Sequence, residues 1–178
     1  SVIVRKNYHS LMDHLAQAVM DLTRKRGGLN IVPPFAERSI KLYSGRVDAL
    51  ASVLNWLKDQ KERYVILSDS NIAMNFDLKL IEAHVSPAQS YHGIQPRRNP
   101  RCACTDNYTI RIDNGRVAEL LSNDYRPGVQ NLSMNLYIIE RESLIQLVRD
   151  ASVRGLVYLA DILARNLNLL NIQAYELT

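Results

Sequence analysis

Residues 64–68 have the sequence Tyr-Val-Ile-Leu-Ser, and this stretch is the clearest strand in the chain. Its apolar run is continuous rather than alternating, which is typical of an inner strand buried on both faces of a largely parallel sheet. Before it, apolar residues recur at helical spacing after Gly45 and predict one helix through residues 47–58. After it, a second helix is predicted from Asp77 to His84. A buried strand between two helices indicates the α/β class.

The same pattern extends outward from this strand in both directions. Further strands are predicted at Val2–Val4, Leu29–Val32, Met134–Ile139 and Ile172–Leu177, and further helices over residues 11–19, 142–150 and 159–167. The pair Asn114-Gly115 between two alternating segments predicts a hairpin and hence some antiparallel pairing. Residues 85–106 contain three prolines and a glycine and are predicted to be irregular. We therefore expect one domain over residues 1–178, with a mixed central sheet flanked by helices.

The charge balance favours anionic partners. The chain of 178 residues carries a net charge of +4, with 22 Lys and Arg against 18 Asp and Glu, and its pI is about 9.1. Such a basic balance suits sugar phosphates and nucleotides as well as nucleic acid.

Cysteine use and hydropathy indicate a cytoplasmic protein without a membrane segment. Cys102 and Cys104 are too few for a disulfide framework. Neither an apolar run of about 18 residues nor a signal-peptide pattern is present in the sequence. The chain opens directly on a predicted strand, which leaves room for native residues upstream.

Two loops are candidate ligand sites because ligands of open α/β sheets lie beyond the carboxyl ends of the strands. One follows the strand at residues 64–68 and has the sequence Ser68-Asp69-Ser70-Asn71. The other, Tyr43-Ser44-Gly45-Arg46, enters a helix, whose free backbone N–H groups can bind phosphate. The alternative is that Gly45 only makes a turn and Ser70 only caps a helix.

Clustered cations and the cysteines suggest three other sites. Arg24, Lys25 and Arg26 predict either an anionic effector site or a solvated helix end. A second basic cluster lies in residues 97–101, but no nucleic-acid motif accompanies it, so nucleic acid is disfavoured as a partner. A zinc site made of Cys102, Cys104 and His92 is disfavoured because a Cys-x-Cys spacing is one residue short of the usual minimum.

Several longer stretches resemble a known family. The chain is similar to the regulatory subunit of bacterial ADP-glucose pyrophosphorylase (glucose-1-phosphate adenylyltransferase) that is found beside a catalytic subunit in glycogen operons. The stretches that carry the resemblance are Lys6–Leu15 (KNYHSLMDHL), Asp21–Leu29 (DLTRKRGGL), Val32–Pro34, Tyr43–Gly45, Tyr64–Ser68, Ser133–Tyr137 (SMNLY) and Asp161–Leu163. They cover most of the chain, and the first is the most specific.

The resemblance implies a fold, an activity and a set of site residues. The implied fold is a nucleotide-diphospho-sugar transferase domain, Rossmann-like, of which this chain is a part that lacks the family's N-terminal glycine-rich loop and C-terminal β-helix. Catalytic members join ATP and glucose 1-phosphate with magnesium to give ADP-glucose and pyrophosphate. The substrate-binding residues implied here are Tyr43, Gly45, Asp48, Ser133 and Met134, and Tyr137 is a further match. Asp161 resembles a metal-site aspartate of the family.

The sequence departs from the catalytic pattern where that pattern carries chemistry. Catalytic members have Ser-Gly-Asp-His after the central strand, and Ser70 stands here at the place of the aspartate that binds magnesium. A neutral hydroxyl is a poor ligand for that cation, which prefers carboxylate oxygen. In the motif Tyr-x-Gly-Thr-Ala-Asp-Ala, Arg46 replaces a much smaller residue. The Glu-Lys-Pro element of the sugar site is not recognisable around residues 119–125.

These departures lead to two functional expectations. The first is a regulatory subunit without catalytic residues of its own, which modulates a catalytic partner, binds no magnesium productively and uses Arg24, Lys25 and Arg26 for an effector. Sugar phosphates or nucleotides are its expected ligands. The alternative is an active glucose-1-phosphate adenylyltransferase whose missing motifs lie outside this chain.

Overall fold

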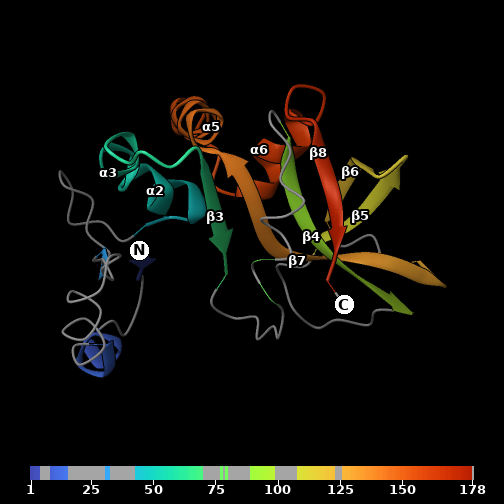
Figure 1. Ribbon diagram of the computed structural model, residues 1–178, viewed down its shortest axis with the longest axis horizontal. Coiled ribbons are helices and arrows are strands. Elements are labelled where there is room, and N and C mark those ends of the chain that lie inside the picture. Colours follow the sequence, from blue (N-terminus) through green and yellow to red (C-terminus); the bar gives the residue numbers. More distant parts are fainter. Residues whose placement is uncertain are drawn as a thin grey trace. The chain divides into compact units, whose positions relative to one another are not determined.

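A computed structural model describes residues 1–4, 9–15, 31–32, 43–69, 77, 79, 89–98, 108–122 and 126–177. These residues form two compact units (Figure 1). Unit 1 comprises residues 1–59 and 148–158, and unit 2 comprises residues 60–147 and 159–178.

Unit 1 contains a small parallel sheet and short helices. Strand β1 (Val2–Ile3) pairs in parallel with β2 (Ile31–Val32), and residues 9–15 are helical. Helix α2 (Arg46–Ala51) and helix α3 (Leu54–Lys58) follow each other, separated by a turn. The prediction of one helix here is wrong, because the Ser52 hydroxyl bonds the carbonyl of Ala49 at 2.7 Å and competes with the helical ladder.

Unit 2 is built on a six-stranded sheet with the order β3-β7-β4-β8-β6-β5. Its strands are β3 (Tyr64–Ser68), β4 (Ser90–Arg98), β5 (Tyr108–Asp113), β6 (Arg116–Ser122), β7 (Val129–Glu140) and β8 (Ile172–Glu176). Strand β7 is long enough to pair with β4 along one edge and with both β3 and β5 along the other. The additional β5–β7 pairing closes five of the strands into a ring, and β4–β8 is the parallel pair among these strands. The mixed central sheet is therefore confirmed.

The environment of β3 differs from the prediction. Its bounds match the predicted strand, but it runs antiparallel to β7, from Tyr64 opposite Glu140 to Ser68 opposite Leu136. In the described part of the chain β3 ends the sheet order, and Ile66 is 44% exposed. A continuous apolar run shows that a strand is hydrophobic, but it does not determine whether the neighbouring strand runs parallel or antiparallel to it.

The prediction of irregular structure around residues 85–106 is wrong for residues 90–98, which form β4. Pro96 is accommodated near the end of the strand, opposite Asn131 of β7. Gly93 lies at an irregularity: His92 pairs with Tyr137 and Ile94 with Ser133, so two extra residues of β7 bulge out opposite the glycine. A Cβ on Gly93 would approach Leu177 Cδ1 at 3.1 Å and Leu136 Cβ at 3.2 Å, so this glycine permits close packing.

The predicted hairpin is confirmed between β5 and β6. Asn114 and Gly115 form its turn with φ values of 47° and 80°. Positive φ at both positions is the requirement of a type I′ turn, for which Asn-Gly is the favoured pair.

Helices and aromatic side chains cover the sheet. Helix α5 (Arg141–Val153) begins directly after β7 and crosses from unit 2 into unit 1, and α6 (Leu159–Arg165) precedes β8. Within unit 2, Tyr91, Leu136 and Ile138 form a buried cluster with Tyr64, Tyr175 and Leu177 packed against it. None of the helices described here is both long and apolar enough to cross a membrane.

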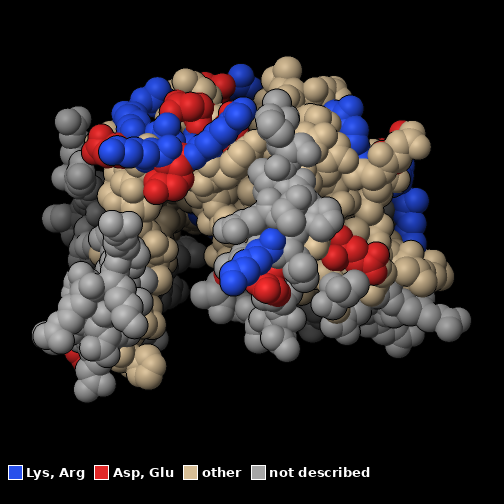
Figure 2. All heavy atoms as spheres, in the orientation of Figure 1, with Lys and Arg blue, Asp and Glu red and all other residues tan. Residues whose placement is uncertain are grey.

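Basic and acidic side chains are interspersed over the described surface visible in Figure 2. Three ion pairs account for part of this pattern: Arg63–Glu140 at 2.9 Å, Arg111–Glu119 at 3.1 Å and Arg141–Glu142 at 2.8 Å. Such partly exposed pairs add little stability because solvent screens them.

Candidate functional site

The loop that enters α2 carries two of the residues predicted to bind substrate, and the first turn of the helix carries a third, Asp48. Gly45 is the residue just before the helix, and Tyr43 is buried at 3% exposure. A Cβ on Gly45 would collide with the side chain of Val157 and lie 2.7 Å from the Val157 carbonyl oxygen. The glycine is therefore required by close packing within unit 1, whether or not a ligand binds.

Backbone N–H groups around this helix start are already engaged. The Asp48 carboxylate accepts the Ser44 N–H at 3.0 Å, and the Val157 carbonyl accepts the Val47 N–H at 3.3 Å. An acid in the first turn that reaches back to the preceding backbone acts much as in a capping box. The structure thus gives Gly45 and Asp48 local structural roles, while substrate binding by Tyr43, Gly45 and Asp48 stays a prediction.

A buried polar network surrounds Ser133, another predicted substrate residue, at the bulge of β7. The Ser133 hydroxyl lies 2.7 Å from His92 Nε2 and donates to Asn135 Oδ1 at 3.2 Å. It also accepts the Asn135 N–H at 3.1 Å. The Tyr137 hydroxyl donates to the same Asn135 Oδ1 at 3.1 Å, and its ring packs on His92 with centroids 4.4 Å apart.

These contacts determine the tautomer of His92. A serine hydroxyl has one proton and two lone pairs. The Ser133 hydroxyl donates its proton to Asn135 Oδ1 and accepts the Asn135 N–H with one lone pair. Its remaining lone pair therefore accepts from His92 Nε2–H. His92 Nδ1 is then a bare acceptor, and it is the buried side-chain atom among the described residues that has no hydrogen-bond partner. The other tautomer would bury an unpaired N–H donor at Nδ1 and would need the Ser133 proton that Asn135 Oδ1 accepts here.

Burial keeps His92 neutral. The side chain has 0% exposure, and desolvation lowers its pKa from 6.5 to about 3. Removal from water disfavours the charged imidazolium form. The network is therefore in one protonation state at neutral pH.

The bulge places Asn135 in a left-handed conformation with φ 46°. Asparagine tolerates this region better than most residues because its short polar side chain can hydrogen-bond locally. Met134, also predicted to bind substrate, lies in the bulge and is half-buried. Ser133 and Met134 thus lie at an irregular strand position of the kind often found beside binding sites.

The implied metal residue Asp161 lies in the first turn of α6, where a negative charge favours the helix dipole. The described residues contain no group of three or more His, Cys, Asp or Glu side chains that could hold a metal ion. The metal-binding role of Asp161 stays a prediction. Ser70, the effector residues Arg24, Lys25 and Arg26, and both cysteines lie outside the described residues.

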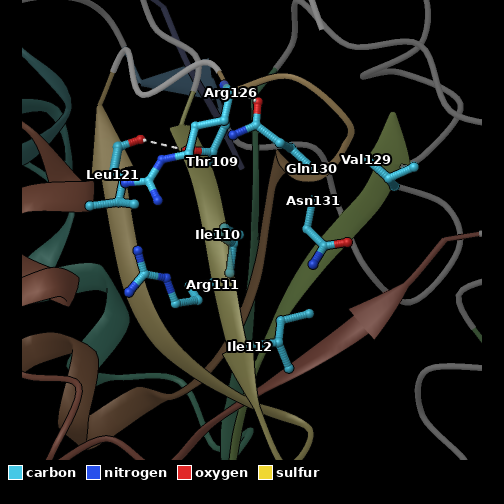
Figure 3. Close-up of a pocket in the computed structure, with 9 residues that line it drawn as sticks. All are labelled: Thr109, Ile110, Arg111, Ile112, Leu121, Arg126, Val129, Gln130 and Asn131. Atoms are coloured by element: carbon cyan, nitrogen blue, oxygen red, sulfur yellow. Dashed lines mark hydrogen bonds between the residues drawn. The ribbon is translucent and has the colours of Figure 1, made fainter. Parts of the chain in front are cut away.

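A cavity of about 280 Å³ lies beside the hairpin and the start of β7 (Figure 3). Arg111 of β5 and Arg126 project their guanidinium groups toward the same side of the hairpin, and the Arg126 side chain lies beside Leu121 and Thr109 (Figure 3). The Gln130 side chain accepts the Arg126 backbone N–H at 2.9 Å. The full lining is Thr109, Ile110, Arg111, Ile112, Leu121, Arg126, Val129, Gln130 and Asn131. The lining is mainly polar, and of its two guanidinium groups that of Arg111 is already paired with Glu119.

Sequence reasoning missed most of this geometry. His92 was considered only as a zinc ligand, and the cavity residues were not singled out. Asn135 carried one usable signal, a turn-forming residue inside a predicted strand. Nothing in the sequence indicates that His92 is the partner of Ser133, because it lies 41 residues away in a segment that is predicted to be irregular.

Comparisons with known proteins identify the fold. No family model matches the chain. Glucose-1-phosphate adenylyltransferases are similar locally: that of Bacillus mycoides (strain KBAB4) is 33% identical over 67 residues, and that of Bacillus cytotoxicus is 31% identical over 68 residues. These matches cover 36% and 37% of this chain and 18% of each relative. The chain thus matches less than a fifth of the length of these curated relatives.

Solved structures match over nearly the whole chain. The inositol-1-phosphate CTP transferase from T. maritima superposes with a TM-score of 0.64 at 10% identity, covering 98% of this chain and 64% of that one. A protein designated a glucose-1-phosphate thymidylyltransferase from Bacillus anthracis, in complex with a sucrose, gives 0.65 at 13% identity, covering 99% and 66%. The chain therefore has the fold of the sugar-phosphate nucleotidyltransferases and corresponds to part of that domain. It also has local sequence similarity to glucose-1-phosphate adenylyltransferases.

Proposed function

We propose that this chain is the nucleotidyltransferase-like part of a regulatory subunit of glucose-1-phosphate adenylyltransferase, acting in cytoplasmic glycogen biosynthesis. The observation that carries the proposal is the combination of two similarities. The nucleotidyltransferase fold extends over 98% of the chain, and a 67-residue stretch is 33% identical to enzymes of that name.

Loss of chemistry in this subunit is supported by the loop after β3. Ser70 stands where the resemblance places a magnesium carboxylate. Phosphoryl and nucleotidyl transfer depend on metal to neutralise developing phosphate charge. The bulky Arg46 at the start of α2 is a second departure, at a position expected to face nucleotide.

The second candidate function is an active adenylyltransferase. It is favoured by the local similarity itself, since the similar proteins carry the name of the enzyme and not of a regulatory subunit. The two candidates share the same expected ligands, and the cavity lined by Arg126 is a candidate place for them under either candidate.

Activity of the parent protein alone distinguishes the two candidates. With ATP, magnesium and glucose 1-phosphate, we expect formation of ADP-glucose at a negligible rate, because a missing metal carboxylate removes several kcal/mol of transition-state stabilisation. Ser70→Asp should not restore turnover by itself, since Arg46 would still misplace the nucleotide. Robust turnover by the unmodified protein would replace the regulatory proposal by the active enzyme.

The proposed partner is a catalytic homologue. Co-expression followed by size-exclusion chromatography should give a mixed oligomer, and separation of the two proteins at micromolar concentration would contradict the proposal. In that oligomer, replacement of Arg24, Lys25 and Arg26 by Ala should weaken the response to sugar-phosphate effectors. Surface substitutions of this kind change stability by less than about 0.5 kcal/mol, so a retained melting temperature is the control.

A further inference from the structure

The hydroxyl of Ser133 is fully engaged inside the protein. Its proton is on Asn135 Oδ1, and its two lone pairs accept from the Asn135 N–H and from His92 Nε2. Ser133, Asn135 and His92 are 5%, 4% and 0% exposed. In this arrangement Ser133 has no proton and no lone pair left for a ligand.

The same network holds an irregular piece of backbone. Asn135 has φ 46° in the middle of β7, a conformation that persists only where surrounding contacts fix it. Its N–H and its side chain are both bonded to Ser133, and Ser133 in turn is fixed by a histidine on the neighbouring strand. Gln130 and Asn131, a few residues earlier on β7, line the cavity beside the hairpin.

We propose that His92 is a positioning residue that holds the β7 bulge through the hydroxyl of Ser133, and that Ser133 acts on a bound sugar phosphate only through this network. The choice of a sugar phosphate as ligand rests on the function proposed above. The positioning of the bulge by His92 is independent of that function.

Two substitutions separate the hydrogen bond of His92 from its packing. His92→Phe keeps an aromatic ring against Tyr137 but removes the donor to Ser133. His92→Gln loses the ring but can place an amide N–H near the position of Nε2. Packing and hydrogen bonding therefore predict opposite rank orders for these two variants.

The measurement is amide hydrogen exchange of Asn135 by NMR in the whole chain. We expect exchange to accelerate on the order of tenfold or more in His92→Phe, because a buried acceptor loses its donor, and to stay near the wild-type rate in His92→Gln. The amides of the β3–β7 ladder over residues 136–140 are the control. Three results would each overturn the proposal. The Asn135 amide could exchange in His92→Phe at the wild-type rate, it could accelerate equally in both variants, or the control amides could accelerate by the same factor as Asn135.

A spectroscopic readout checks the tautomer directly. Long-range ¹H–¹⁵N spectra of the wild type should show the His92 proton on Nε2 and a bare Nδ1, unchanged as the pH is lowered to about 5. A proton on Nδ1 would make Ser133 the donor to Nε2, leave one Ser133 lone pair open to a ligand, and overturn the second part of the proposal.

Titration with glucose 1-phosphate tests the link to ligand. His92→Phe should weaken its binding, and Ser133→Ala should weaken it at least as much because it also releases Asn135. The double variant should bind no more weakly than Ser133→Ala, because both residues act through one network. A double variant that binds more weakly than Ser133→Ala, or a His92→Phe variant that binds like the wild type, would overturn that part. Failure of the wild type to bind glucose 1-phosphate would instead contradict the proposed ligand and leave the exchange experiment to decide the role of His92.

Discussion

The loop at the start of α2 and the bulge of β7 were both predicted to bind substrate, and in both the polar groups are engaged within the protein. In the loop the partners are mostly local: Asp48 bonds the N–H of Ser44, four residues earlier. In the bulge the decisive partner of Ser133 is His92, 41 residues earlier on another strand. A motif that matches a binding site can therefore also have a structural role. That role can be predicted from the sequence when the hydrogen-bond partners are a few residues apart, but not when they lie on distant strands.

The largest expected effect tests the close packing of the loop. Gly45→Ala should lower the free energy of unfolding by about 3 kcal/mol, the upper part of the usual range for overpacking, because its Cβ would meet both the side chain and the carbonyl of Val157. Chemical denaturation measures this change. Val157→Ala in the same chain should recover only part of it, since the carbonyl contact remains. An unchanged midpoint for Gly45→Ala would show that the glycine is kept for ligand approach alone.

The next effect belongs to the bulge and appears as a pH dependence. Burial lowers the pKa of His92 from 6.5 to about 3, so between these values the unfolded chain binds one more proton than the folded one. Stability is therefore complete above about pH 6.5 and falls with decreasing pH at up to about 1.4 kcal/mol per unit.

The matched control for this pH dependence is His92→Gln, which has no titrating group at the position. Between about pH 6.5 and pH 5, the wild type should lose about 2 kcal/mol more unfolding free energy than this variant. Equal losses in parallel denaturation series would mean that His92 titrates normally in the folded protein.

The smallest effect concerns the Asp48 carboxylate in the first turn of α2. Asp48→Ala should destabilise the protein by up to about 1 kcal/mol, because a negative charge at the helix start is lost together with the bond to the Ser44 N–H. Asp48→Asn should retain more of the stability because its side-chain oxygen can still accept the Ser44 N–H. Thermal melts of the two variants give the comparison. A neutral Asp48→Ala would remove the capping role and return Asp48 to the list of ligand candidates.

Local patterns predicted much of the fold. The bounds of β3 and the Asn114-Gly115 turn follow from residues adjacent in sequence, because a turn and a strand depend chiefly on local backbone preferences. The β4 strand was missed because Gly93 and Pro96 are turn formers in isolation. In the structure Gly93 permits close packing against Leu136 and Leu177, and Pro96 lies near the end of the strand.

The sequence by itself determined the α/β composition, the mixed sheet, and most strand and helix positions. Only the tertiary structure decided that β3 is antiparallel to its neighbour, that β5 and β7 close a ring, and that Ser133 is bonded to His92. The physical reason is that hydrophobic periodicity and turn preference act over a few residues. Strand direction and the pairing of buried polar groups depend instead on which distant segments meet when the core forms, and no short stretch of sequence carries that information.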